Sequence, residues 1–214
     1  FYRSSLIGEI KKKRKLEDPR KKDFKPTQIK VGDLTFLIAR HFGFCYGVEN
    51  AIEKSYKAIK ENPDKRIFLL SQMIHNPDVN EDLESHGLKF LQDTYGKQLI
   101  PFEELTSEDI VIIPAFGTTV EIEEKLKQKG IEIDTYNTTC PFVEKVWNRS
   151  AKLGDSNHTI VIHGKVKHEE TRATFSHSSK NSPSIVIKDI NEAKVLGEFV
   201  SGNREMHEFH KIFE

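Results

Sequence analysis

Runs of neighbouring apolar residues alternate along the chain with segments of helical periodicity. Apolar residues that follow one another directly, rather than at every second place, are typical of strands buried on both faces of a parallel sheet. We predict strands in these stretches: 36–39, 67–70, 109–113, 131–136, 159–162 and 185–187. Strands that alternate with helices predict an α/β fold of repeated units, each with a parallel sheet covered by helices.

The helices between these strands are predicted from apolar periodicity and from N-cap residues. A helix is expected over 48–61, where apolar residues recur at helical spacing. N-cap residues predict where the other helices begin, because their side-chain oxygens accept hydrogen bonds from the first free N–H groups of a helix. The expected N-caps are Asn76, Thr118, Thr139 and Asp189. Glu121 would complete a capping box with Thr118.

Charge divides the chain unevenly, although the net charge is zero. The first 30 residues hold 11 Lys or Arg and 4 Asp or Glu, with a basic run at 11–15. No aromatic residues interleave with that run, so we expect a solvated arm and no nucleic-acid partner. We predict a basic arm over 1–33, a first α/β unit over 34–139 that carries Cys45, and a second unit over 140–214 that stops within a domain.

The composition favours a reducing, cytoplasmic setting. No apolar run is long enough to span a bilayer, so no membrane partner is expected, and no secretory signal is visible. The two cysteines lie far apart in the sequence, unlike a disulfide framework. In a reducing compartment a functional cysteine would be a metal ligand or a nucleophile.

Residues that could bind a metal or an anion, or transfer a proton, follow the predicted strands. Cys45 lies between two glycines directly after the apolar run at 36–39, and His75, Cys140 and His168 also come just after strands. Ligands of parallel sheets bind where the strands end, so we expect these residues to gather there. Two thiolates suit an iron–sulfur cluster or zinc, and paired histidines at helix starts suit a phosphate. A glutamate such as Glu170 beside them could deliver a proton.

Five separated motifs occur in a fixed order. They are H-F-G-F-C-Y-G-V-E-N-A-I (41–52), M-I-H-N (73–76), P-A-F-G-T-T (114–119), T-T-C-P-F-V-E-K-V (138–146) and H-G-K-V-K-H-E-E-T-R-A-T (163–174). Together they resemble the 4-hydroxy-3-methylbut-2-enyl diphosphate reductase family, and in particular its long plant- and cyanobacterial-type members. The resemblance covers roughly Leu34 onward.

The resemblance implies three α/β units around a central 4Fe–4S cluster, with one cysteine ligand from each unit. The open iron would bind the hydroxyl of a small allylic diphosphate. Two electrons and two protons would remove that hydroxyl as water, leaving isopentenyl and dimethylallyl diphosphate in the last step of the non-mevalonate isoprenoid pathway. An electron donor such as ferredoxin or flavodoxin is implied as a partner.

The same resemblance implies roles for individual residues. Cys45 and Cys140 would be two cluster ligands, His75 and His168 would hold the diphosphate, and Glu170 would supply the proton. Phe116 stands where many members have His, which implies one imidazole fewer in the diphosphate pocket. A third cysteine and the family's later Q-T-T and Ser-x-Asn motifs are absent from these 214 residues. We therefore expect a fragment of about the N-terminal two thirds, lacking the third unit and inactive by itself.

Two other interpretations fit the residues. One is a hydrolase or transferase in which a histidine activates Cys45 or Cys140 as nucleophile. The other is a non-catalytic α/β binding module.

Overall fold

The computed structural model describes residues 4–20 and 22–213, which form two compact units, Phe1–Phe44 and Cys45–Glu214. The boundary between the units lies between Phe44 and Cys45, whereas the sequence analysis placed the end of the N-terminal arm at residue 33. The units are called unit 1 and unit 2 below, and each is described by itself. The boundary predicted at residue 140 between a first and a second α/β unit stays a prediction.

Unit 1 is a helix and a hairpin. The helix α1 (Ser5–Glu17) begins at Ser4, and β1 (Thr27–Val31) pairs antiparallel with β2 (Leu34–Ile38). The prediction that the apolar run before Cys45 is a strand of a parallel sheet was therefore wrong. Val31 pairs with Leu34 across a two-residue turn, and Gly32 takes the positive φ of 59° that such a turn favours.

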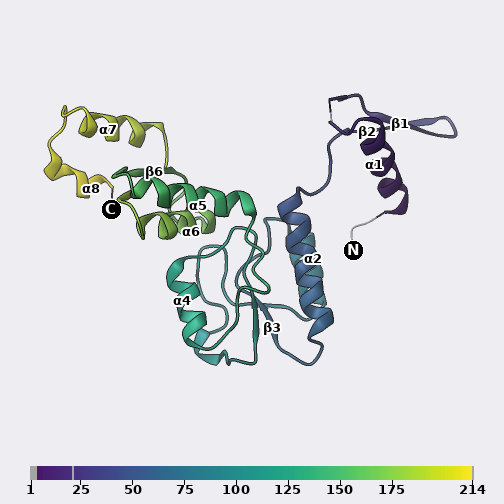
Figure 1. Ribbon diagram of the computed structural model, residues 1–214, viewed down its shortest axis with the longest axis horizontal. Helices are drawn as coiled ribbons and strands as arrows, with labels where there is room; N and C mark the ends of the chain where they lie inside the picture. Colours follow the sequence, from purple (N-terminus) through teal and green to yellow (C-terminus); the bar gives the residue numbers. More distant parts are fainter. Residues whose placement is uncertain (1–3, 21, 214) are drawn as a thin grey trace. The chain divides into compact units, whose positions relative to one another are not determined.

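The larger sheet of unit 2 is parallel, with strand order β4-β3-β5. Its strands are β3 (Ile67–Leu69), β4 (Lys89–Phe90) and β5 (Ile110–Ile112). The helices of this part are α2 (Tyr46–Glu61), α3 (Pro77–Ser85), the 3₁₀ turn η1 (Phe102–Glu104) and α4 (Val120–Gln128). Figure 1 shows α2 and α4 on opposite sides of β3. A buried cluster of apolar side chains around Phe68, Leu91 and Val111 forms the core.

A second parallel sheet pairs β6 (Ile160–His163) with β7 (Ser184–Ile187). Its helices are α5 (Pro141–Gly154), α6 (Glu169–Ser179) and α7 (Ile190–Val200), followed by η2 (Met206–Glu208) and α8 (Phe209–Ile212). Helix α6 contacts β6, β7 and α5, and it also contacts α4 (Figure 1). The α/β fold with parallel sheets is confirmed in unit 2, and α6 packs against elements from both of its parts.

Two of the expected caps are confirmed and two were placed one residue early. Asn76 accepts from the N–H of Val79, and Asp189 caps α7. The N-cap of α4 is Thr119 rather than Thr118, and that of α5 is Cys140 rather than Thr139. The Thr139 hydroxyl instead donates to the Asn137 side chain at 2.6 Å, so it completes the preceding turn.

The stretch 131–136, expected to be a strand, is not one. Ile131 and Ile133 are buried, but the Glu132 carboxylate accepts hydrogen bonds from the N–H groups of Asp134 and Thr135. Those N–H groups are thereby used in a local turn, and only an isolated parallel bridge from Ile113 to Asn137 continues the sheet. Among the described residues, no helix has both the length and the apolar character needed to cross a membrane.

Candidate functional site

An aromatic cluster is formed by residues that follow three strands of unit 2, two from the larger sheet and one from the smaller sheet. His75 follows β3, Phe116 follows β5 and His168 follows β6. The His75 ring stacks on Phe116 with centroids 4.6 Å apart, and it lies 5.0 Å from the ring of His168. The sequence predicted that the two histidines gather at one end of the strands, and the structure brings them into contact.

The loop that carries His75 is held by a buried asparagine. The Asn80 side chain accepts from the N–H of Met73 at 3.0 Å and donates to the carbonyl of Ile74 at 2.9 Å. These two hydrogen bonds fix the loop between β3 and α3, so the backbone position of His75 is set by α3.

Phe116 is positioned by the glycine after it. Gly117 has a φ of 75°, a backbone conformation that suits glycine, and a Cβ there would collide with the Trp147 ring. Trp147 in turn stacks on His177 with centroids 3.7 Å apart. The P-A-F-G turn therefore packs closely against α5, which places Phe116 against His75.

His168 caps the helix that follows it. Its Nδ1 accepts from the N–H of Glu170 at 3.3 Å, so a neutral ring carries its proton on Nε2. Nε2 is then the nitrogen able to donate to an anion. The cap also joins the backbone N–H of Glu170, the predicted proton donor, to the His168 side chain.

Glu169 belongs to this site, although the sequence analysis gave it no role. Its side chain is 5 % exposed, its Oε2 accepts from the Ser71 hydroxyl at 2.6 Å, and its Oε1 lies 3.6 Å from Nε2 of His75. A signal was present in the sequence. Glu169, Ala173 and Ser176 recur at helical spacing, which predicts the buried face of α6, and all three are buried.

Burial dominates the electrostatics of this pair. Desolvation raises the pKa of Glu169 to about 7, against the opposing hydrogen bond from Ser71. Desolvation also lowers the pKa of His75, assisted by repulsion from His168. Both shifts favour the uncharged forms of the two side chains.

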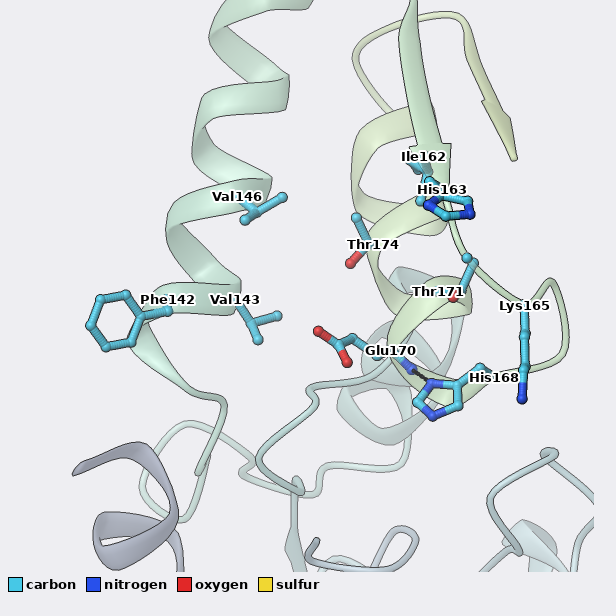
Figure 2. A pocket seen from close by; sticks show the side chains of 11 residues that line it. Phe142, Val143, Val146, Ile162, His163, Lys165, His168, Glu170, Thr171 and Thr174 are labelled. Atoms are coloured by element: carbon cyan, nitrogen blue, oxygen red, sulfur yellow. Dashed lines mark hydrogen bonds between the residues drawn. The ribbon is translucent and has the colours of Figure 1, made fainter. Parts of the chain in front are cut away.

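A cavity of about 580 Å³ opens beside His168. Figure 2 shows Phe142, Val143 and Val146 of α5 on one side, with the Glu170 carboxylate extending toward them from α6. The rest of the lining comes from β6, its following loop and α6: Ile162, His163, Gly164, Lys165, His168, Thr171 and Thr174. The cavity thus has an apolar wall opposite a basic and hydroxyl-rich one.

The two cysteines occupy equivalent positions. Cys45 is the N-cap residue of α2 and Cys140 that of α5, neither thiol makes a capping hydrogen bond, and both are free. Gly47, in the first turn of α2, is buried against Cys140, since a Cβ added there would lie 2.6 Å from its Sγ. The start of α2 therefore meets the thiol of α5.

Cys140 also connects to the aromatic cluster. Its N–H donates to the carbonyl of Ala115 at 2.9 Å, next to Phe116, and the residues after it line the cavity. Within the described part of the chain, neither sulfur lines that cavity and no group of three or more potential metal ligands occurs. Two unpartnered thiols at helix starts suit a thiophilic metal or cluster as a partial ligand set.

Fold and site together define the class: an α/β protein whose parallel strands end at an imidazole–carboxylate cluster, with two free thiols at helix N-cap positions in the same unit. The chain belongs to the LytB protein family, whose model matches residues 36–209.

Curated relatives agree with this family. The chain is 38% identical over 99% of its length to a 4-hydroxy-3-methylbut-2-enyl diphosphate reductase of Synechococcus sp. (strain WH7803), and 36% identical over 99% to that of Trichormus variabilis. It covers 48% of each of these relatives, so it spans about half the length of the curated proteins that it matches.

The chain is also similar in structure to solved reductases of the same kind. One is titled as (E)-4-hydroxy-3-methyl-but-2-enyl diphosphate reductase, the terminal enzyme of the non-mevalonate pathway (TM-score 0.59, 28% identity, 70% of this chain and 50% of that one). Another is the E-1-hydroxy-2-methyl-but-2-enyl-4-diphosphate reductase of Plasmodium falciparum (TM-score 0.61, 25% identity, 71% of this chain and 44% of that one).

Proposed function

We propose that this chain forms part of a reductase that converts 4-hydroxy-3-methylbut-2-enyl diphosphate to isopentenyl and dimethylallyl diphosphate. The observation that carries the proposal is the gathering of His75, His168 and Glu170 in the unit that also holds both cysteines. In the reaction the substrate's C–O bond breaks, its hydroxyl leaves as water, and two electrons and two protons are consumed.

His75 and His168 hold the diphosphate in this proposal. Their rings lie 5.0 Å apart, close enough to contact neighbouring phosphate oxygens. Nε2 of His168 is the donor because Nδ1 is used in the helix cap. Lys165 adds a positive charge to the same cavity wall, and charge-assisted hydrogen bonds of this kind favour an anion.

Glu170 delivers a proton in this proposal. It lines the cavity opposite the apolar wall of α5, which suits the branched hydrocarbon of an allylic substrate. The N–H of Glu170 donates to Nδ1 of His168, so Glu170 adjoins one of the two histidines that hold the diphosphate in this proposal. A proton held there is close to a hydroxyl leaving group at the other end of so short a substrate.

Cys45 and Cys140 are two ligands of a 4Fe–4S cluster in this proposal. When bound, the cluster supplies a Lewis-acidic iron and a path for single electrons. Free thiols at two adjoining helix starts fit such a ligand pair, because backbone N–H groups there stabilise an anion. The third thiolate would come from outside these 214 residues, which hold two cysteines, so residues 1–214 alone are expected to be inactive.

The proposal extends to the setting and the electron supply. Unpaired cysteines fit a reducing compartment such as the cytoplasm. A cluster takes up electrons one at a time, so a single-electron carrier protein such as ferredoxin or flavodoxin fits as the donor.

Anaerobic reconstitution tests the ligands. The complete protein that carries this sequence is treated with iron and sulfide, as are its Cys140→Ser and Cys45→Ser variants. We expect the brown cluster absorption to be lost in each variant, and turnover of the allylic diphosphate to fall at least about a thousandfold, since a two-thiolate site holds a cluster poorly. Met206→Leu, which removes an exposed sulfur from η2, is the control and should keep both. Persistence of the absorption in Cys140→Ser would contradict the assignment.

A cysteine-nucleophile hydrolase fits less well. Such an enzyme needs an imidazole in hydrogen-bond reach of the sulfur. Among the described residues, no hydrogen bond joins either cysteine sulfur to a histidine, and the two imidazoles of the site contact each other instead.

A further inference from the structure

The buried carboxylate of Glu169 connects two strand ends. Glu169 begins α6, and its Oε2 accepts a hydrogen bond from the hydroxyl of Ser71, which lies two residues after the end of β3 in the loop that carries His75. A hydrogen bond of 2.6 Å between buried partners fixes the position of this carboxylate relative to that loop.

The other carboxylate oxygen faces His75. Oε1 of Glu169 is buried and makes no hydrogen bond, and Nε2 of His75 lies 3.6 Å from it. A buried oxygen without a hydrogen bond is costly, and a small movement of the exposed imidazole would satisfy it. Once Nε2 is so used, Nδ1 is the nitrogen of His75 that remains for a ligand.

We propose that Glu169 is the positioning residue of His75: it holds the ring through Nε2 and compensates the imidazolium that forms when a diphosphate contacts Nδ1. This inference rests on the proposed function, since it assigns the means by which one half of the diphosphate site acquires its charge. Glu169 itself contacts no substrate in this proposal.

The proton balance is internal to the pair. In the free site the carboxyl proton of Glu169 lies on Oε1 and the neutral His75 carries its own proton on Nδ1. As an anion arrives, the proton on Oε1 moves to Nε2, which leaves a carboxylate and a doubly protonated ring. The raised pKa of Glu169 and the lowered pKa of His75 both favour this uncharged starting state.

Other charged groups act on the pair from α6, from its N-cap residue and from the segment after β4. Arg172 of α6 favours the charged carboxylate, whereas Glu170 of α6 and Asp93, after β4, oppose it. His168 opposes a charge on His75, and Glu170 favours one. A diphosphate bound between the imidazoles would outweigh the repulsion between them, because its charge attracts both.

The test measures binding of inorganic pyrophosphate to the complete protein, together with ¹⁵N chemical shifts of His75. In the wild type we expect His75 to become doubly protonated on binding. In Glu169→Gln we expect the affinity to fall about tenfold to a hundredfold, as for a lost charge-assisted hydrogen bond, and His75 to stay neutral. Ser71→Ala removes the hydrogen bond to the carboxylate but keeps the carboxylate, and it should lower the pyrophosphate affinity about threefold to tenfold.

Asp109→Asn is the matched control. It makes the same acid-to-amide change in a buried carboxylate that precedes β5, at the opposite end of the sheet from the site. It is expected to lower stability and to leave pyrophosphate affinity and the His75 shifts unchanged. A matching loss of affinity in this control would overturn the inference, because general destabilisation would then explain the effect.

Failure of the inference and failure of the proposed function give different results. If Glu169→Gln binds pyrophosphate as the wild type does and His75 still takes up its proton, the positioning role is wrong. If His75→Ala also leaves the affinity unchanged, the diphosphate role of His75 itself is wrong. Kinetics with the allylic substrate should show the Glu169→Gln effect mainly in KM, since positioning of a binding group acts on substrate affinity.

Discussion

Two adjacent glutamates of α6 have different environments. Glu169 points into the protein and is 5 % exposed, whereas Glu170 is exposed and lines the cavity. One residue of helix is about 100° of rotation, which is enough to separate a buried side chain from one that faces a ligand. The first is suited to position a neighbour and the second to reach a substrate.

The burial of Glu169 predicts a pH dependence of stability. Its pKa is about 7 in the folded protein, compared with 4.5 for an unburied glutamate. The folded state therefore binds this proton more tightly, and the contribution to stability is full below about pH 4.5 and lost as the pH rises through about 7. We expect a loss of at most about 3 kcal/mol from this residue.

Urea unfolding from pH 5 to 8 checks this, with Glu169→Gln as the comparison. Glutamine does not titrate, so the wild type should lose stability relative to the variant as the pH rises. The lowered pKa of His75 contributes a slope of opposite sign, because its stability is lost as the pH falls. Both proteins contain His75, so subtracting their free energies of unfolding at each pH reduces the contribution of His75. Parallel curves would contradict the assignment of a raised pKa to Glu169.

At the scale of elements, the site is assembled from the starts of helices. α3 begins one residue after Asn76, α5 begins after Cys140, and α6 begins after His168. Free N–H groups at such positions favour anionic ligands, so helix starts that meet produce an electropositive region without many basic side chains. The start of α2 also adjoins Cys140 at the start of α5, and how closely the two approach depends on the absence of a side chain at Gly47.

Gly47 makes that dependence testable. A methyl group at residue 47 would lie 2.6 Å from Sγ of Cys140, so Gly47→Ala should push α2 from α5 and cost about 1–3 kcal/mol. Gly197→Ala is the control, because Gly197 lies inside α7 with nothing within 4 Å of an added Cβ. Gly197→Ala should raise the free energy of unfolding by about 0.5–1 kcal/mol. Thermal unfolding of both variants checks the pair, and equal effects would show that Gly47 is not in close contact.

At the scale of the whole molecule, the buried core belongs to unit 2. The apolar residues with buried side chains all lie between Ala51 and Phe199. Among residues 4–20 and 22–44, no residue is buried, and several large apolar side chains of the hairpin are exposed. Because burial of apolar surface is the main stabilising contribution, the stability of the chain resides in unit 2.

Removal of unit 1 should therefore have little thermal effect. A chain of residues 45–214 behind a start methionine should unfold within about 4 °C of the intact chain, which corresponds to about 1 kcal/mol for a domain of this size. Circular dichroism at 222 nm during heating measures this. A drop of about 10 °C or more would mean that unit 1 stabilises unit 2.

The sequence predicted most of the local structure, because local structure depends on neighbouring residues. Caps such as Asn76 and Asp189 were confirmed, as were the continuous apolar strands of unit 2 except the one expected at 131–136. The errors lie where local and distant interactions compete. The apolar run at 36–39 was expected in a parallel sheet, but a two-residue turn lets β2 pair with its neighbour β1.

By itself, the sequence determined most of the helices and strands of unit 2 and that His75 and His168 follow strands, since periodicity and capping are properties of neighbouring residues. It also identified the family through five ordered motifs, which the match over 36–209 confirms. Only the tertiary structure decided that Glu169 faces His75 and that Gly47 adjoins Cys140. Those contacts join residues 94 and 93 positions apart, and such pairs are set by how sheets and helices pack rather than by any local pattern.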